Sequence, residues 1–140
     1  MNPVVRSILA VITGMLVAFV LIGLVQAIGM RIYPPPPGMD PTNIESIKAA
    51  MAQIPLAALL FVLLSYAAGS VAGGWVAARF APARKMRHAM MVAALLFGAG
   101  LMNLTTVPHP TWFAVVSSLI YWLGAWSGAV AASSPARRTV

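Results

Sequence analysis

Four long apolar runs constrain this chain more than any other feature of its sequence. They cover residues 8–30, 55–78, 89–107 and 111–132, and none contains Asp, Glu, Lys or Arg. A run of about 20 helical residues, rising 1.5 Å each, crosses the hydrocarbon core of a bilayer. The pattern therefore predicts four membrane-spanning α-helices.

Composition excludes an ordinary soluble domain. Hydrophobic residues make up 61% of the 140 residues and charged residues 8%, whereas roughly a quarter of the residues in a typical globular protein are charged. The net charge of +7 lies between the apolar runs rather than on one folded face, so no nucleic-acid partner is expected. Cysteine is absent, which excludes disulfides and thiolate sites.

The connecting segments differ in charge, and this difference predicts orientation. One side carries seven basic residues: Arg6, Arg79, Arg84, Lys85, Arg87, Arg137 and Arg138. The other side carries only Arg31 and Lys48. Because loops rich in Lys and Arg remain in the cytoplasm, both termini are predicted to be cytoplasmic. Residues 1–140 then form one all-α membrane domain, a four-helix bundle.

The first run could instead be a cleaved signal peptide, because Val25-Gln26-Ala27 satisfies a small-residue cleavage rule. Its apolar region is longer than the 7 to 15 residues that such peptides use, which favours retention. Cleavage would leave the other three spans unchanged.

The outer loop, residues 31–54, begins with a proline run at 34–37 that predicts a stiff polyproline II rod, followed by a turn at Gly38. A short amphipathic helix is predicted over about 42–53. Either Asp40 caps it with Pro41 at the first helical position, or Thr42 and Glu45 form a capping box. The apolar stripe of this helix lies on the outer membrane surface or packs onto the tops of the spans.

The inner loop, residues 79–88, is strongly basic. Arg84, Lys85 and Arg87 are predicted to attract anionic lipid headgroups, although the loop could serve only to set topology.

Small residues recur at four-residue spacing in two spans, which is typical of closely packed membrane helices. The predicted packing residues are Ser65, Gly69, Gly73, Ala77, Gly124 and Gly128. Helix 1 of the predicted bundle adds Gly14 with Ala18 and Gly23 with Ala27. These faces could pack within the chain, or one could receive a second copy or another membrane protein.

The uncharged span interiors argue against a proton-driven exporter. A path for a neutral solute could still be lined by Tyr66, Ser70, Ser117 and Tyr121, although hydrogen bonds between helices would also explain these residues. The two tyrosines lie at one depth near the midplane, and Gln26 and Asn103 share a depth nearer the outer ends. No metal or cofactor is expected, since His109, Asp40 and Glu45 lack ligand spacing.

Three segments resemble a group of small bacterial four-span inner-membrane proteins: Y-P-P-P-P-G-M-D-P, A-G-S-V-A-G-G-W-V-A-A-R and N-L-T-T-V-P-H-P-T-W-F. The resemblance implies this architecture and a bacterial inner membrane, and it implies no chemistry.

The leading functional hypothesis is a non-enzymatic membrane protein that acts through helix contacts, as a homo-oligomer or an accessory subunit. The alternative is a small transporter or channel for a neutral or amphipathic solute. An enzyme acting on lipid at the outer face ranks third, because the sequence contains no nucleophile with an adjacent base and no paired carboxylates.

Overall fold

A computed structural model describes residues 2–40 and 42–134, and this part of the chain is all-helical, with no strand. Its five α-helices are α1 (Pro3–Ile32), α2 (Ile44–Ala50), α3 (Leu56–Phe80), α4 (Lys85–Thr106) and α5 (Thr111–Ser133), with a 3-10 turn at Met51–Gln53. All except α2 are long and apolar enough to cross a membrane. Four candidate spans are therefore present, as predicted.

Local sequence sets where the helices begin. Pro3 occupies the first turn of α1, where the Asn2 side chain accepts a hydrogen bond from the Val4 amide at 2.9 Å. Pro55 and Pro110 stand immediately before α3 and α5. These prolines fit there because a proline lacks only an N–H that the first helical turn leaves unpaired.

Helix α4 begins earlier than its apolar run. It starts at Lys85 rather than Ala89, so the predicted loop 79–88 shrinks to the four residues between α3 and α4. Lys and Arg are good helix formers, so a helix can continue through them outside the hydrocarbon. The end of the apolar run marks only the edge of the hydrocarbon. Arg137 and Arg138, the last of the predicted cytoplasmic charges, lie outside the described residues.

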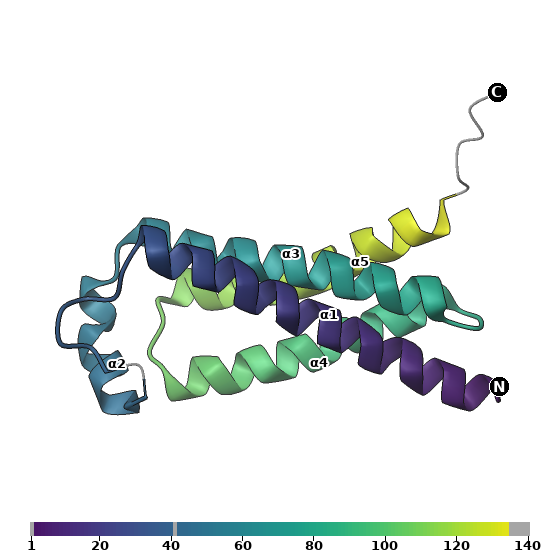
Figure 1. Cartoon of the computed structure of the whole chain (residues 1–140), viewed down its shortest axis with the longest axis horizontal. Helices are drawn as coiled ribbons and strands as arrows, with labels where there is room; N and C mark the ends of the chain where they lie inside the picture. The colour runs from purple at the N-terminus through teal and green to yellow at the C-terminus, as the bar shows by residue number, and fades with distance from the viewer. Residues whose placement is uncertain (1, 41, 135–140) are drawn as a thin grey trace, which may run out of the picture.

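The α3 helix occupies the centre of the bundle, with α1 packed on one flank and α5 on the other (Figure 1). α4 packs against α5 and α3, and contacts α1 less extensively. We call the end of the bundle that carries α2 the α2 end, and the end with residues 81–84 the basic end. α1 begins and α5 ends at the basic end, so the spans run up and down.

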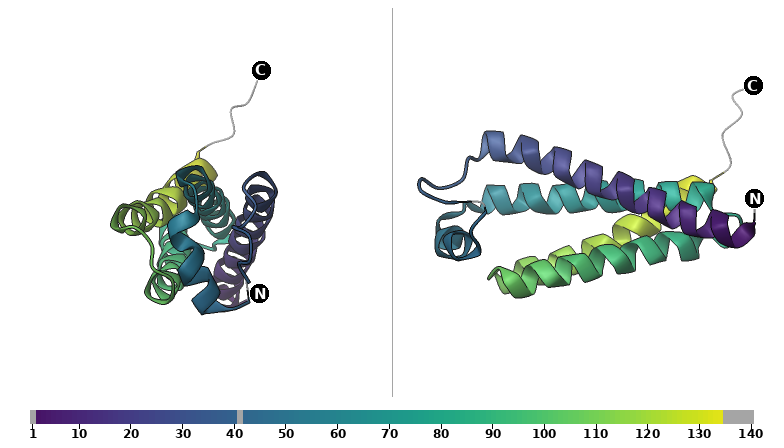
Figure 2. Two further views of the ribbon diagram at one scale, coloured as in Figure 1. Left: turned by 90° about the vertical axis from the view of Figure 1, so that its left-hand side faces the viewer. Right: turned by 60° about the horizontal axis from the view of Figure 1, so that its bottom comes forward.

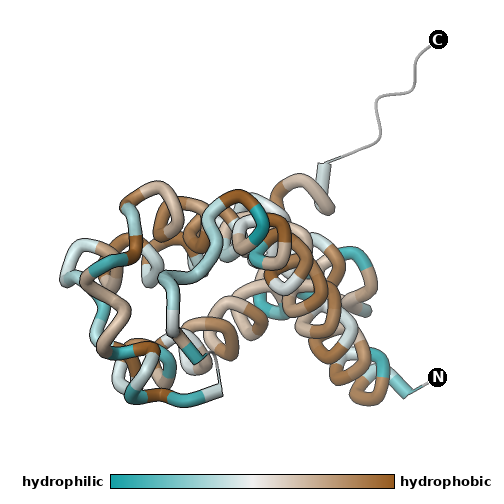
Figure 3. The backbone as a smooth tube through the Cα atoms, turned by 60° about the vertical axis from the view of Figure 1, so that its left-hand side comes forward, coloured by the Kyte–Doolittle hydropathy of each residue, from teal (hydrophilic) through white to brown (hydrophobic). Residues whose placement is uncertain are grey.

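The helices separate toward the α2 end. Figure 2 shows α4 diverging from α1 in that direction, while the four spans converge toward the basic end. The buried residues Ala77, Val92 and Ala129 form close-packed clusters toward that basic end. Figure 3 shows the corresponding division in polarity, since the spans are largely apolar and hydrophilic residues gather in the loop that includes α2.

Candidate functional site

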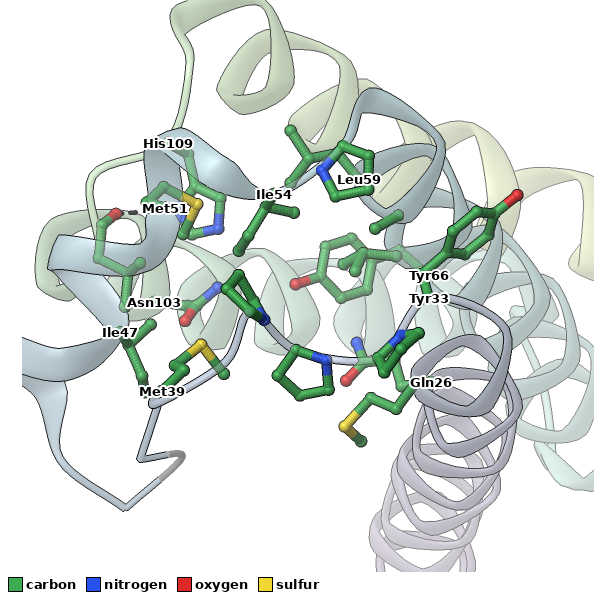
Figure 4. Close-up of a pocket in the computed structure, with 18 residues that line it drawn as sticks. Gln26, Tyr33, Met39, Ile47, Met51, Ile54, Leu59, Tyr66, Asn103 and His109 are labelled. Carbon is green, nitrogen blue, oxygen red and sulfur yellow. Dashed lines mark hydrogen bonds between the residues drawn. The ribbon is translucent and has the colours of Figure 1, made fainter.

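A cavity of about 310 Å³ occupies the opening at the α2 end (Figure 4). We call it the mouth cavity. Its walls come from the end of α1, the proline segment, α2, the first turns of α3 and the end of α4. Most of the lining is apolar and includes Met30, Met39, Ile47, Met51, Ile54 and Leu59. Flexible methionines suit a surface that adapts to differently shaped apolar groups.

A second cavity of about 260 Å³ lies deeper, between α1 and α4. We call it the deep cavity, and its lining includes Phe19, Ile22, Leu96, Ala99, Gly100 and Tyr121. Gln26, Tyr66 and Asn103 line both cavities. The two cavities therefore adjoin at these three residues, which we call the polar neck.

The polar neck is neutral and partly organised by hydrogen bonds. Gln26 Nε2 donates to Ser65 Oγ at 3.2 Å, and Ser65 Oγ donates in turn to the Val62 carbonyl at 2.6 Å. The rings of Tyr66 and Tyr121 lie 5.2 Å apart. An alanine Cβ at Gly100 would lie 2.7 Å from the Tyr121 ring, so this glycine makes room for that ring against α4.

No Asp, Glu, Lys or Arg of the described chain lines either cavity. Among the described residues that line the mouth cavity, His109 is the one titratable side chain besides tyrosine, and its ring stacks on Phe113 with centroids 4.7 Å apart. Its Nδ1 lies 2.8 Å from the Val107 carbonyl. Since a carbonyl oxygen can only accept a hydrogen bond, Nδ1 carries the hydrogen of this bond.

Helix α2 covers the mouth cavity through one face. Ile47 and Met51 line the cavity together with Ile54, while Ile44 and Lys48 are exposed. Of the two placements considered from sequence, this geometry corresponds to packing over the tops of the spans. The helix proper is also shorter than the predicted 42–53, because residues 51–53 tighten into the 3-10 turn.

Both predicted caps for α2 are wrong. The cap is Asn43, whose side-chain oxygen accepts hydrogen bonds from the amides of Glu45 and Ser46 at 2.9 and 3.4 Å. Asp40 instead accepts from the Thr42 amide and hydroxyl at 2.8 and 2.7 Å, which closes a local turn. Asp and Asn favour such side-chain turns as readily as caps, so spacing alone did not separate the two roles.

The turn at Gly38 agrees with its prediction. Gly38 has a φ of 83°, and the Met39 amide donates to the Pro36 carbonyl at 3.1 Å. Proline followed by a residue with positive φ is the signature of a type II turn, in which glycine carries no Cβ penalty. This turn leads the chain from the proline segment back toward α2.

Thr42 lowers the pKa of Asp40 below its ordinary value of 3.8, first through its hydroxyl and second through its amide. The bonds that close this turn are therefore complete above pH 3.8 and are lost as pH falls through the lowered pKa. Thr42→Val should raise the Asp40 pKa toward 3.8, because it removes the larger of the two contributions. NMR titration of the Asp40 carboxyl would measure the change, and an unchanged pKa would contradict the assignment.

The predicted small-residue faces of α3 and α5, and the Gly14 and Ala18 face of α1, pack within the chain, whereas Gly23 and Ala27 of α1 are exposed and an added Cβ on Gly23 meets nothing within 4 Å. Ser65, Gly69, Gly73 and Ala77 face α1, where an added Cβ on Gly73 would lie 2.7 Å from the Gly14 carbonyl oxygen. Gly124 and Gly128 face α3, against Ser70, Val71 and Trp75. Gly74, which the predicted packing residues do not include, packs directly against the backbone of Ala125 in α5.

The predicted polar path divides into two parts. Tyr66 and Tyr121 lie together beside the deep cavity, in keeping with their shared depth. Ser70 and Ser117 line neither cavity and are fully or almost fully buried. Ser70 Oγ bonds the Tyr66 carbonyl at 2.7 Å and the Ile120 carbonyl at 3.3 Å, so it joins α3 to α5.

The acidic residues at the α2 end have local partners. Glu45 forms an exposed ion pair with Lys48 at 2.9 Å, and Asp40 bonds Thr42. Among residues 2–40 and 42–134, no group of three or more His, Asp or Glu side chains is placed to hold a metal ion.

At the basic end, Arg84 and Arg87 are exposed, whereas Lys85 is half-buried. Lys85 Nζ donates to the Ala132 carbonyl at 3.4 Å, at the end of α5. A cation there complements the helix dipole, so Lys85 contributes to the fold as well as to the basic surface. Attraction of anionic headgroups to this surface remains a prediction.

Sequence reasoning missed the polar neck as one site. Gln26 and Asn103 were placed at one depth and Tyr66 at another, whereas the tilt of the helices brings all three to the junction of two cavities. Such a site can hydrogen-bond an uncharged polar group and surround an apolar body. Comparison with protein families, curated proteins and solved structures finds no match to this chain.

Proposed function

We propose that this chain is a membrane protein that binds a neutral amphipathic molecule in the two adjoining cavities, as a small transporter or channel for such solutes would. One observation carries the proposal: apolar walls converge on the uncharged polar neck of Gln26, Tyr66 and Asn103. Ligand sites commonly combine an apolar lining with a few polar groups that fix orientation.

The lining favours neutral ligands over ions. An unpaired charge at membrane depth costs about 2.5 to 3.5 kcal/mol on insertion scales. Neither cavity offers an Asp, Glu, Lys or Arg to offset that cost. An alcohol, ketone or amide head would instead exchange hydrogen bonds with the amide and phenol groups of the neck.

Action through helix contacts, with a second copy or another membrane protein, receives less support. The small-residue faces of α3 and α5, with Gly14 and Ala18 of α1, pack against one another within the chain, and only the Gly23 and Ala27 face of the described part of α1 is left exposed for a partner. We also propose no catalytic role, since the neck combines no nucleophile with a base.

The charge distribution supports an outward-facing cavity. Arg6, Arg79, Arg84, Lys85 and Arg87 lie toward the basic end, whereas Arg31 and Lys48 lie toward the α2 end. The positive-inside rule then places both termini in the cytoplasm and the mouth cavity outside. We also propose that this membrane is the bacterial inner membrane, as the resemblance to small four-span proteins implies.

Two single-cysteine variants test this orientation, because the natural chain contains no cysteine. Ala52→Cys lies at the α2 end and Ala83→Cys lies in the basic loop, and both alanines are exposed. A membrane-impermeant maleimide added to intact cells should label Ala52→Cys and should label Ala83→Cys only after permeabilisation. The opposite pattern would place the mouth cavity in the cytoplasm.

Ligand class can be tested by photolabelling the full chain in phosphatidylcholine nanodiscs with a diazirine-bearing octanol. Labelling should map to peptides that line the mouth cavity. Unlabelled octanol should compete at least about tenfold better than octanoate or octylamine at neutral pH, because an uncompensated charge costs more than the 1.4 kcal/mol that a factor of ten represents.

A matched pair of variants controls for incidental labelling. Ala58→Trp fills the mouth cavity, whereas the neighbouring Ala57 lines none of the cavities described here. Labelling should be lost in Ala58→Trp and retained in Ala57→Trp. Equal competition by the charged compounds, or equal labelling of the two variants, would refute the proposal.

A further inference from the structure

The deep cavity opens sideways, toward the space that lipid would occupy. It lies between α1 and α4, and its rim includes Phe19, which is 50% exposed, and the exposed Ala99. Phe19 lies near the middle of α1, well inside the candidate span. Figure 2 shows α4 diverging from α1 toward the α2 end. We call the side of the deep cavity that Phe19 and Ala99 border the portal.

Besides the lateral opening, the position of Asn103 also points to a ligand. It is an exposed amide on α4, within a helix long and apolar enough to span a membrane, and it lines both cavities. Polar side chains facing lipid are costly, and in membrane proteins they face the bundle interior, a cavity or a partner. Asn103 meets this condition beside Tyr66, with which it lines both cavities.

We infer that the ligand is a neutral membrane lipid with a hydroxyl or carbonyl head, which enters between α1 and α4. Its head then lies at the polar neck, and its chain extends through the portal into the bilayer. This inference rests on the proposed binding function and names the ligand class for the same site.

The geometry favours a lipid over a freely dissolved solute because the site has an apolar exit within the span. A chain leaving past Phe19 and Ala99 remains in an apolar environment along its whole length, so none of its CH₂ groups has to enter water. The same lining disfavours phospholipids. A phosphate is recognised by Arg or Lys, and neither residue type lines the deep cavity.

The test uses the full chain in phosphatidylcholine nanodiscs that contain hexadecanol with a diazirine on its chain. Photolabelling should reach the segments of α1 and α4 that border the portal. Ala99→Trp, which narrows the portal, should reduce this labelling roughly tenfold, because the indole occupies the space through which the lipid chain would pass. The control is Ala94→Trp, since Ala94 is exposed on the same helix and lines no cavity described here.

Labelling with the diazirine-bearing octanol separates failure of this inference from failure of the proposed function. Octanol should still label the mouth cavity in Ala99→Trp, which also shows that this variant is folded. If octanol labels the natural chain but hexadecanol does not, lateral lipid entry is wrong and solute binding stands. If neither labels it, both are wrong. Equal labelling by diazirine-bearing hexadecyl phosphate would overturn the neutral headgroup.

Discussion

Gly74→Ala should lower the free energy of unfolding by about 2 to 3 kcal/mol, within the range for overpacking. A Cβ on Gly74 would lie 2.6 Å from both the carbonyl oxygen and the Cα of Ala125. Backbone atoms cannot rotate away as a side chain does, so α3 and α5 would have to separate. That separation removes contacts along the whole length of their interface.

The chain provides matched controls for this substitution. An added Cβ at Gly23 of α1 or Gly98 of α4 meets nothing within 4 Å. Gly23→Ala and Gly98→Ala should therefore be neutral or slightly stabilising, because alanine has the higher helix propensity. Reversible unfolding in mixed micelles would compare the three variants. A Gly74→Ala protein as stable as these controls would contradict the α3–α5 packing described here.

The spans were predictable because their signals are local. Run length and the absence of charge are properties of consecutive residues, and Pro55 and Pro110 mark starts that the helices keep. Helix ends beyond the hydrocarbon were less predictable, as the extension of α4 to Lys85 shows. The apolar pattern reports the membrane boundary, and a helix need not stop there.

The sequence predicted only part of how the small-residue faces pair between helices. The four-residue spacing identified one close-packing stripe on α3, which faces α1. The second face of α3, where Ser70 and Gly74 meet α5, lies one position along in sequence but on a different side of the helix. Sequence spacing shows which residues share a face, but it does not show which neighbour that face will meet.

The candidate site depended on information that the sequence lacks. The predicted path included Ser70 and Ser117 because their hydroxyls lie near the midplane tyrosines. Both hydroxyls instead donate hydrogen bonds to backbone carbonyls of their own helices. Gln26 and Asn103 instead line the cavities, because α4 diverges from α1 only toward the α2 end. A relative tilt between helices follows from their packing as a whole and leaves no short-range signature.

Replacing the two amides of the neck should abolish most ligand affinity. The double variant Gln26→Leu/Asn103→Leu removes two neutral hydrogen-bonding groups, each contributing about 0.5 to 1.5 kcal/mol, so octanol affinity should fall by about 5- to 150-fold. Competition against the diazirine-bearing octanol in nanodiscs measures this loss. The matched control is Ser117→Ala, which removes a hydroxyl that lines neither cavity and should leave affinity unchanged.

Stability distinguishes a binding role for these amides from a structural one. Ser65 keeps its bond to the Val62 carbonyl when Gln26 is removed, so no buried hydroxyl loses its last partner. Leucine also suits a membrane environment better than an amide does. The double variant should therefore unfold no more easily than the natural chain while binding far less octanol. Lower stability with unchanged affinity would instead make Gln26 and Asn103 structural residues and remove the polar neck as a ligand site.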